Sequence, residues 1–317
     1  MSSTAESTPG EASVRSGAAP GAAPSGLLRG IVRTVRPRQW VKNVLVLAAP
    51  FAAFAADPVF RVDVVIDAGY AFVAFCLVSS AVYLVNDAID VEADRAHPTK
   101  RNRPIAAGVV PVRLAYSLSV LLFLASFAVS LLSSWRLLVV IGVYAAVQLG
   151  YCLGLKHQPV IDLCIVASGF LLRAIAGGAA AGLPLSQWFL LVTAFGSLFM
   201  VAGKRYAEIT LYERTGARIR ASLSKYSASY LRFVWATSAA IMIMTYALWA
   251  FEIRQRTGTN SVWAVVSIVP FVVAVLRYAV DVDGGNAGEP EDIALRDRVL
   301  QVLGCSWVAC VALSAFF

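Results

Sequence analysis

The chain has 317 residues, of which 59% are hydrophobic and 15% charged, and its mean hydropathy is +0.71. Water-soluble globular proteins have about 45–50% apolar and about 25% charged residues, so these values exclude that class and predict a polytopic membrane protein. In such a protein a formal net charge of +8 is typical of basic cytoplasmic loops, and we expect no nucleic-acid partner.

The N-terminal 26 residues are rich in Ser, Ala, Pro and Gly and contain no apolar stretch long enough for a signal peptide. We interpret them as a disordered tail, followed by a single membrane domain over residues 27–317. That domain opens with a basic segment, residues 27–42, in which Arg29, Arg33 and Arg36 recur at helical spacing. This spacing indicates an amphipathic segment on the membrane surface.

Nine apolar segments follow, and a bilayer core needs about 20 apolar residues per helix. They cover residues 41–56, 62–94, 111–132, 136–155, 159–181, 186–206, 226–251, 261–281 and 297–316. The second is too long for a simple span, so we expect its polar C-terminal end to protrude. The predicted fold class is therefore an all-α bundle of nine transmembrane helices.

The distribution of basic residues predicts the orientation of this bundle. Of the 27 Lys and Arg residues, 22 fall on the side of the N-terminus, four fall on the opposite side and Arg173 lies inside a span. Because basic loops stay in the cytoplasm, we expect a plasma-membrane protein with its N-terminus inside and its C-terminus outside.

A carboxylate cluster follows the second apolar segment, in the stretch NDAIDVEAD at residues 86–94. On a helix Asp87, Asp90 and Asp94 fall within about 60° of one another, at the membrane boundary. Hard oxygen ligands of this kind suit Mg²⁺, whose shell is completed by water and substrate phosphates. The plainer interpretation is a solvated helix end, but the adjoining span and the basic sequence that follows favour a metal site.

That basic sequence places Lys100, Arg101 and Arg103 within ten residues of Asp94. Alone, such a run is typical of a cytoplasmic anchor. Beside a metal site it indicates neutralisation of a diphosphate leaving group. We interpret His97 as a loop residue without a catalytic role.

Three further groups of polar residues are expected on the same cytoplasmic side. They are Gln39, Trp40, Lys42 and Asn43; Tyr151, Lys156 and Asp162; and Lys204, Arg205, Tyr206 and Glu208. Lys204 and Glu208 could equally form an i,i+4 surface pair. Arg173 must face the bundle interior, where structural pairing and substrate contact remain equally open.

These motifs resemble the UbiA superfamily of intramembrane prenyltransferases. The resemblance rests on N-D-x-x-D-x-x-x-D at 86–94 with K-R-x-R-P at 100–104, and extends through Y-x-x-x-x-K at 151–156 and G-F-x-L-R-x-x-A-G-G at 169–178. It implies a central cavity that holds Mg²⁺ and diphosphate at its cytoplasmic end and opens sideways to lipid.

The second Asp-rich motif of the superfamily, usually D-x-x-x-D, is altered. It reads K-R-Y-A-E at 204–208 here, so two cations and one acid replace the two expected carboxylates. More bases and fewer acids favour substrates that carry more phosphate. With the stretches at 36–51, 200–208 and 277–300, the variant is similar to members that transfer 5-phosphoribose from phosphoribosyl diphosphate to decaprenyl phosphate for cell-wall arabinan synthesis. The alternatives are prenyl transfer to an aromatic or isoprenoid acceptor, and a cation-coupled transporter.

The resemblance assigns Asp87, Asp90 and Asp94 to the catalytic metal. The expected substrate-binding residues share the cytoplasmic side and a polar or charged group: Lys42, Asn43, Asn86, Lys100, Arg101, Arg103, Tyr151, Lys156, Lys204, Arg205, Tyr206 and Glu208. Which cation meets which phosphate, the number of Mg²⁺ ions, the prenyl chain length and the oligomeric state, including a homo-oligomer, stay open.

An acidic loop over residues 281–292 separates the last two predicted spans. Its Gly and Pro residues favour a solvated loop that turns the chain. The alternative is a mobile cap over the bound sugar phosphate, in which Asp281 orients a phosphate-binding cation.

Overall fold

A computed structural model describes residues 24–56, 61–215, 225–256, 262–285, 287, 293 and 296–316. Within these ranges every regular element is a helix, as the hydropathy pattern predicts. Most of the expected N-terminal tail, residues 1–23, and much of the acidic loop, residues 286 and 288–292, lie outside the described part.

The first predicted span is not one continuous helix. The surface helix α1 (Pro24–Val35) is followed by a 3₁₀ helix, η1 (Pro37–Leu47), and only then by α2 (Ala48–Ala56). Arg36 joins α1 to η1 in a left-handed conformation, with φ 57° and ψ 58°. The span predicted at 41–56 is therefore divided between η1 and α2.

The other helices follow the predicted segments, except that α8 runs well past the predicted end at 206 and the segment at 261–281 is divided between α10 and α11. They are α3 (Val62–Ile89), α4 (Val91–Arg95), η2 (Lys100–Asn102), α5 (Val112–Ser133), α6 (Trp135–Cys152), η3 (Leu155–His157), α7 (Ile161–Ala181), α8 (Gln187–Thr215), α9 (Ala228–Arg256), α10 (Trp263–Val266), α11 (Ile268–Asp283) and α13 (Arg298–Phe316). Among the described residues seven helices are long and apolar enough to cross a membrane, with Arg298–Ser314 a shorter apolar helix. The predicted number of nine spans is thus not confirmed.

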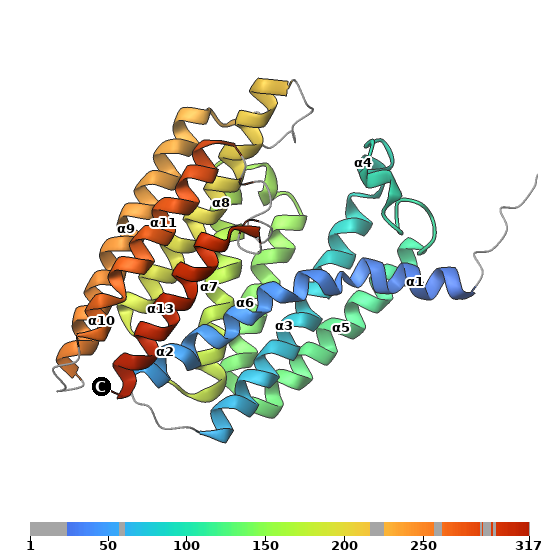
Figure 1. The fold of residues 1–317 in the computed structure, drawn as a ribbon. Coiled ribbons are helices and arrows are strands. Elements are labelled where there is room, and N and C mark those ends of the chain that lie inside the picture. The colour runs from blue at the N-terminus through green and yellow to red at the C-terminus, as the bar shows by residue number, and fades with distance from the viewer. Residues whose placement is uncertain are drawn as a thin grey trace, which may run out of the picture.

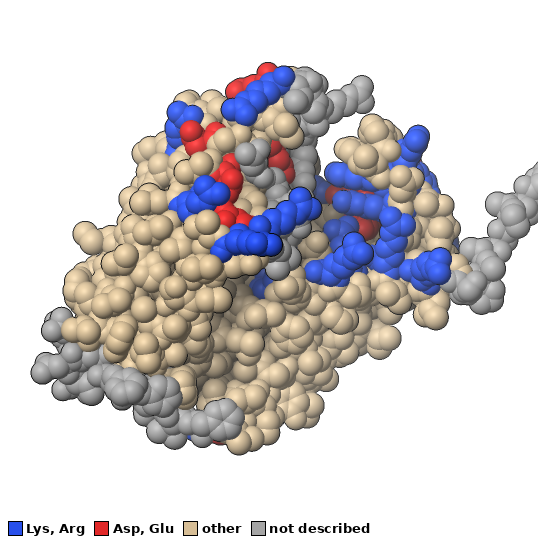
Figure 2. Space-filling model, viewed as in Figure 1, with Lys and Arg blue, Asp and Glu red and all other residues tan. Residues whose placement is uncertain are grey.

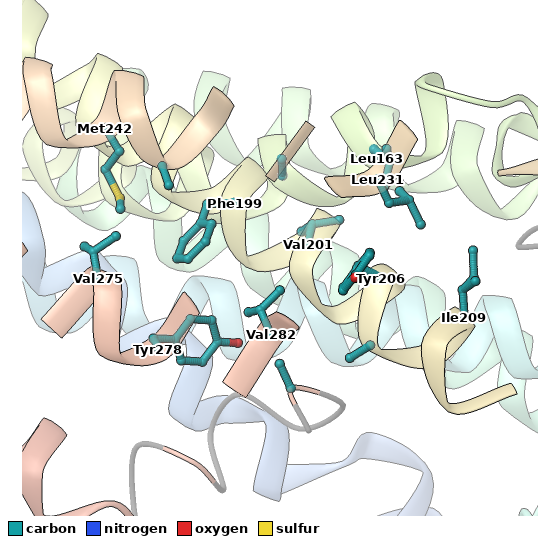
Figure 3. Close-up of a cluster of buried hydrophobic side chains, with 14 of the residues drawn as sticks. Leu163, Phe199, Val201, Tyr206, Ile209, Leu231, Met242, Val275, Tyr278 and Val282 are labelled. Carbon is teal, nitrogen blue, oxygen red and sulfur yellow. The ribbon is translucent and has the colours of Figure 1, made fainter. Parts of the chain in front are cut away.

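Two hydrophobic clusters hold the bundle together, and α7 belongs to both. One joins α7 to α8, α9 and α11 around Phe199, Tyr206 and Val282, with Phe199 edge-on to Tyr278 (Figure 3). The other joins α7 to η1, α3 and α6 around Val46, Phe75 and Ile141. In Figure 1, α3 and α5 accordingly form one side of the bundle, α8, α9 and α11 the other, and α6 and α7 lie between them.

Small residues on α7 allow η1 to approach its backbone. A Cβ on Gly177 would stand 1.9 Å from the carbonyl oxygen of Val46 and 3.1 Å from Pro50. Because no side chain fits there, η1 packs directly on the α7 backbone and its Asn43 becomes fully buried.

The antiparallel path gathers chemistry-bearing residues at one end of the bundle. The ends of α3, α6 and α11 meet the starts of α7 and α9 there, beside the polar second half of α8. As predicted for an overlong second segment, α3 ends at Ile89, and the polar α4 continues beyond it. The candidate site is therefore assembled from elements far apart in sequence.

Candidate active site

Asp87, in the last turn of α3, is the most enclosed carboxylate of the expected metal site. It is 2% exposed, and Arg36 Nη2 donates to both of its oxygens at 2.6 and 2.7 Å. Arg103 Nη1 donates to the same carboxylate at 3.0 Å. Arg36 has a left-handed backbone, and its guanidinium lies against Asp87 and over the ring of Tyr83.

Asp94 and Asp90 have different partners. Arg103 Nη1 also donates to Asp94, at 2.7 Å, so this guanidinium bridges Asp87 and Asp94. Lys100 Nζ lies 4.0 Å from Asp94. Asp90 instead accepts from Lys156 Nζ at 2.6 Å.

The three carboxylates therefore share the expected helix face only in part. The α3 helix ends before Asp90, and the described residues hold no group of three His, Cys, Asp or Glu side chains that could hold a metal. In this structure Arg36, Arg103 and Lys156 neutralise the three carboxylates. The donor chemistry still fits Mg²⁺, since carboxylate oxygens are its usual protein ligands, but binding it requires exchange with these cations.

A second group of ionisable residues joins α7, α8 and the start of α9. Asp162 is 1% exposed and lies 3.0 Å from Arg205 Nη2, which is itself buried. The Tyr226 hydroxyl donates to Asp162 and accepts from the backbone N–H of Val160 at 2.6 Å. Burial, and then the hydrogen bond to Asp162, raise the pKa of Tyr226 above its ordinary value, so this hydroxyl keeps its proton to a higher pH than an ordinary tyrosine does.

The turn that leads into α7 is strained. Val160 has φ 68° and ψ −50°, and the N–H of Ile161 bonds the carbonyl of Pro159 at 2.8 Å, which makes a γ-turn. A β-branched residue seldom adopts this conformation. The turn presents the Val160 N–H to Tyr226 and leaves Asp162 in the first turn of α7.

Tyr206 belongs to a third group, with Arg232 of α9 and Asp283 of α11. Arg232 Nη2 donates to the Tyr206 hydroxyl and lies 3.1 Å from Asp283. Thus Asp283, in the described part of the acidic loop region, contacts Arg232, and the orienting role expected of Asp281 stays a prediction.

Arg173 is held inside the bundle. Its Nε donates to Asn43 Oδ1 at 2.7 Å, Nη1 to the Gly169 carbonyl at 2.7 Å and Nη2 to the Tyr144 hydroxyl at 3.1 Å. The guanidinium also lies against three aromatic rings. The structure therefore favours a structural, pairing role for Arg173. Asn43, which we expected to bind phosphate, instead accepts a hydrogen bond from Arg173 inside the bundle.

The remaining expected substrate-binding residues are spread around this end of the molecule. Lys42, Asn86, Tyr151, Lys204 and Glu208 are half-buried, whereas Arg101 is exposed. His97 Nδ1 accepts from the backbone of Thr99 and Lys100, which is consistent with a loop residue.

Cavities open at both ends of the bundle. A cavity of about 370 Å³ adjoins Asp87 and is lined by Arg33, Arg36, Lys100 and Arg103. Another, of about 760 Å³, adjoins Tyr206, Arg232 and Asp283. A third cavity, of about 1010 Å³, is mainly apolar and lies at the opposite end, near Arg61 and Glu252, away from the carboxylate cluster.

Sequence reasoning did not single out three residues of this site: Arg36 as the partner of Asp87, Tyr226 and Arg232. Arg36 is 51 positions from Asp87, so no local spacing links them. The one local signal is that Arg36 precedes Pro37, which disfavours helix at that position and marks the end of α1.

Comparison with known proteins gives consistent matches. The family model described as "UbiA prenyltransferase family" matches residues 44–295. A decaprenyl-phosphate phosphoribosyltransferase of Mycolicibacterium smegmatis is 58% identical over 301 residues, which cover 93% of this chain and 95% of that protein. The protein of the same name from Mycobacterium tuberculosis is 59% identical over 295 residues, covering 93% and 97%.

A solved structure, a UbiA homolog from Archaeoglobus fulgidus bound to DMAPP and Mg²⁺, has a TM-score of 0.67 to this chain at 15% identity. The match covers 90% of this chain and 99% of that one. At this identity the likeness establishes the fold.

Proposed function

The chain belongs to the UbiA prenyltransferase family of multi-pass membrane proteins, and we propose that it transfers 5-phosphoribose from phosphoribosyl diphosphate to decaprenyl phosphate. The products are decaprenylphosphoryl-5-phosphoribose, a precursor for cell-wall arabinan, and diphosphate. Relatives that share 58% and 59% of their residues with this chain carry the name of this activity.

The observation that carries the proposal is the excess of cations at the carboxylate cluster. Among the described residues, Arg36, Lys100, Arg103 and Lys156 lie against the three carboxylates of Asp87, Asp90 and Asp94, and the altered second motif adds Lys204 and Arg205. Phosphoribosyl diphosphate and a lipid phosphate bring three phosphate-bearing groups, and cations of this kind neutralise them.

In the proposed reaction an oxygen of the lipid phosphate attacks C1 of the ribose, and the bond from C1 to the diphosphate oxygen breaks. The lipid phosphate is already anionic at neutral pH, so no side chain needs to remove a proton. The protein's task is to orient the two anions and to stabilise charge on the departing diphosphate. Lys100, Arg103 and Lys156 are placed for this task.

We further propose that the enzyme depends on Mg²⁺, held by Asp87, Asp90 and Asp94. When bound, the ion would stabilise negative charge on the diphosphate. Release of the carboxylates from Arg103 and Lys156 would free these cations for substrate phosphates. The solved UbiA homolog from Archaeoglobus fulgidus, which is bound to DMAPP and Mg²⁺, supports a divalent metal in the family.

The proposed location is the plasma membrane, with the N-terminus and the active site cytoplasmic. The excess of Lys and Arg on one side of the predicted spans supports this orientation. A charged donor then reaches the site from the cytosol, while the acceptor enters from the bilayer.

Product analysis tests the proposal. Purified protein in lipid nanodiscs is incubated with Mg²⁺, decaprenyl phosphate and phosphoribosyl diphosphate labelled in the ribose. We expect labelled lipid and stoichiometric diphosphate, both abolished by EDTA. Product formed instead from a prenyl diphosphate and an aromatic acceptor would establish the alternative prenyl transfer.

A further inference from the structure

The cavity of about 370 Å³ beside Asp87 is built from two segments on either side of that carboxylate. The end of α1 provides Arg33, Thr34 and Arg36, and the segment around η2 provides Thr99, Lys100, Asn102 and Arg103. Figure 2 shows Lys and Arg side chains gathered over the region of α1 and α4, with acidic atoms beneath them.

The charge of this cavity is strongly positive. Its lining holds four cationic side chains and one carboxylate, that of Asp87, which is 2% exposed. Arg36 and Arg103 meet at this carboxylate, and Arg103 also pairs with Asp94. Charge compensation is therefore incomplete, which favours an anionic ligand.

The cavity is formed before any ligand enters, because its two walls are packed together. A Cβ on Gly30 of α1 would meet Val109 Cγ1 at 2.8 Å, and the apolar side of α1 packs against Ile105 and Val110. Arg36 holds a left-handed conformation that is unfavourable for a side-chain-bearing residue. Strain of this kind is concentrated at ligand sites.

We propose that this cavity binds the 5-phosphate of the sugar donor, with Arg33 and Arg36 as ligands supplied by the surface helix. This inference rests on the proposed function. In the proposed function, the diphosphate of the donor binds beside the metal held by the carboxylates. The cavity next to Asp87 adds the cations of Arg33 and Arg36 and the polar side chains of Thr99 and Asn102. A terminal phosphate monoester fits these groups, and a prenyl donor has no corresponding group.

The test measures binding separately from turnover. Full-length protein in nanodiscs is titrated with ribose 5-phosphate and, separately, with diphosphate, using wild type, Arg33→Gln and Asn102→Ala. The matched control is Arg29→Gln, which removes an exposed charge from the same helix one turn earlier, outside the cavity. The KM values for phosphoribosyl diphosphate and for decaprenyl phosphate are measured on the same samples.

We expect Arg33→Gln to weaken ribose 5-phosphate binding and to raise the donor KM by about tenfold, the effect of one charge-assisted hydrogen bond. Asn102→Ala should cause a smaller loss, and Arg29→Gln none. Diphosphate binding and the acceptor KM should be unchanged.

The proposal is overturned if Arg33→Gln and Asn102→Ala both match wild type, or if the loss falls on diphosphate or on the lipid acceptor. Arg33-dependent binding of ribose 5-phosphate without phosphoribosyl transfer would support the cavity as a phosphate site. That result would reject the proposed reaction alone.

Discussion

Asp87 and Asp90 are only three residues apart, yet they differ in burial and in partners. Asp87 meets two guanidinium groups and its side chain is 2% exposed, whereas Asp90 meets Lys156 and its side chain is 28% exposed. Removing a buried, paired charge leaves its partners uncompensated, which costs more than losing a partly exposed pair.

We therefore expect Asp87→Asn to abolish turnover and also to lower the free energy of unfolding by about 2–3 kcal/mol. Asp90→Asn should abolish turnover with a stability loss below about 1 kcal/mol. Activity at limiting Mg²⁺ and thermal unfolding in detergent measure the two effects. Near-wild-type activity of both variants would contradict their assignment to the metal.

Tyr226 gives a prediction about pH. Its hydroxyl connects Val160 to buried Asp162, so Tyr226→Phe should destabilise the protein by about 1–3 kcal/mol at pH 8. Because the folded pKa is raised above the ordinary 10.0, the unfolded chain loses this proton first as the pH rises. The contribution is complete below pH 10 and declines above it.

Thermal unfolding of wild type and Tyr226→Phe at pH 8 and near pH 11 checks this expectation. The difference between the two proteins should narrow at the higher pH. A constant difference across the range would argue against a raised pKa for Tyr226.

At the scale of elements, the contact between η1 and α7 depends on one position. Gly177→Ala would place a methyl group 1.9 Å from the Val46 carbonyl oxygen, and backbone cannot swing aside as a side chain can. We expect a loss of about 3 kcal/mol or more, or failure to accumulate in the membrane. Gly142→Ala on α6, where nothing lies within 4 Å, is the control and should be neutral or stabilising.

Unfolding midpoints and membrane yield of the two alanine variants test this contact. Equal stability of the two would mean that η1 can move away from α7 at little cost.

At the γ-turn before α7 we expect the opposite effect: a change to glycine should stabilise the protein. Val160 is 46% exposed, so its side chain adds little packing, and glycine adopts a positive φ without strain. Val160→Gly should raise the free energy of unfolding by about 0.5–1 kcal/mol, after the entropy cost of glycine. Val139→Gly, at an exposed position inside α6, should lower it by about 1 kcal/mol. Destabilisation by both changes in thermal unfolding would show that Val160 is unstrained.

Hydropathy predicted most elements well, because apolar length is what a bilayer requires. The segments at 111–132 and 159–181 differ from α5 and α7 by at most two residues at either end. The segment at 186–206 was too short, since α8 continues to Thr215 through charged residues that remain helical. The break between η1 and α2 was missed because an apolar pattern does not distinguish a 3₁₀ helix from an α-helix.

The candidate site was less predictable than the fold. The residue types and the cytoplasmic end follow from the motifs, and Lys156, Arg103 and Arg205 do lie against carboxylates. Which carboxylate each of these cations pairs with depends on how the helices pack in the folded protein. Asp90 pairs with Lys156, whereas Asp87 and Asp94 share Arg103, and Arg36 reaches Asp87 from a left-handed backbone.

For the whole molecule, orientation is the testable property. Ala107 is exposed beside the carboxylate end, and Asp63 is exposed at the opposite end of α3. In a cysteine-free background, Ala107→Cys should resist a membrane-impermeant maleimide added to intact cells, while Asp63→Cys should react. The reverse pattern would place the site outside the cytoplasm.

The enclosure of Arg173 has a consequence for biosynthesis. An arginine in the middle of a transmembrane helix raises the insertion free energy by about 2.5–3.5 kcal/mol, so α7 is a poor candidate to enter the bilayer alone. The hydrogen-bond partners of Arg173 on other elements, Asn43 and Tyr144, both precede it in the chain. Both leave the ribosome before α7 does. Because translation runs from the N- to the C-terminus, the residues that hydrogen-bond Arg173 are made before the arginine that needs them.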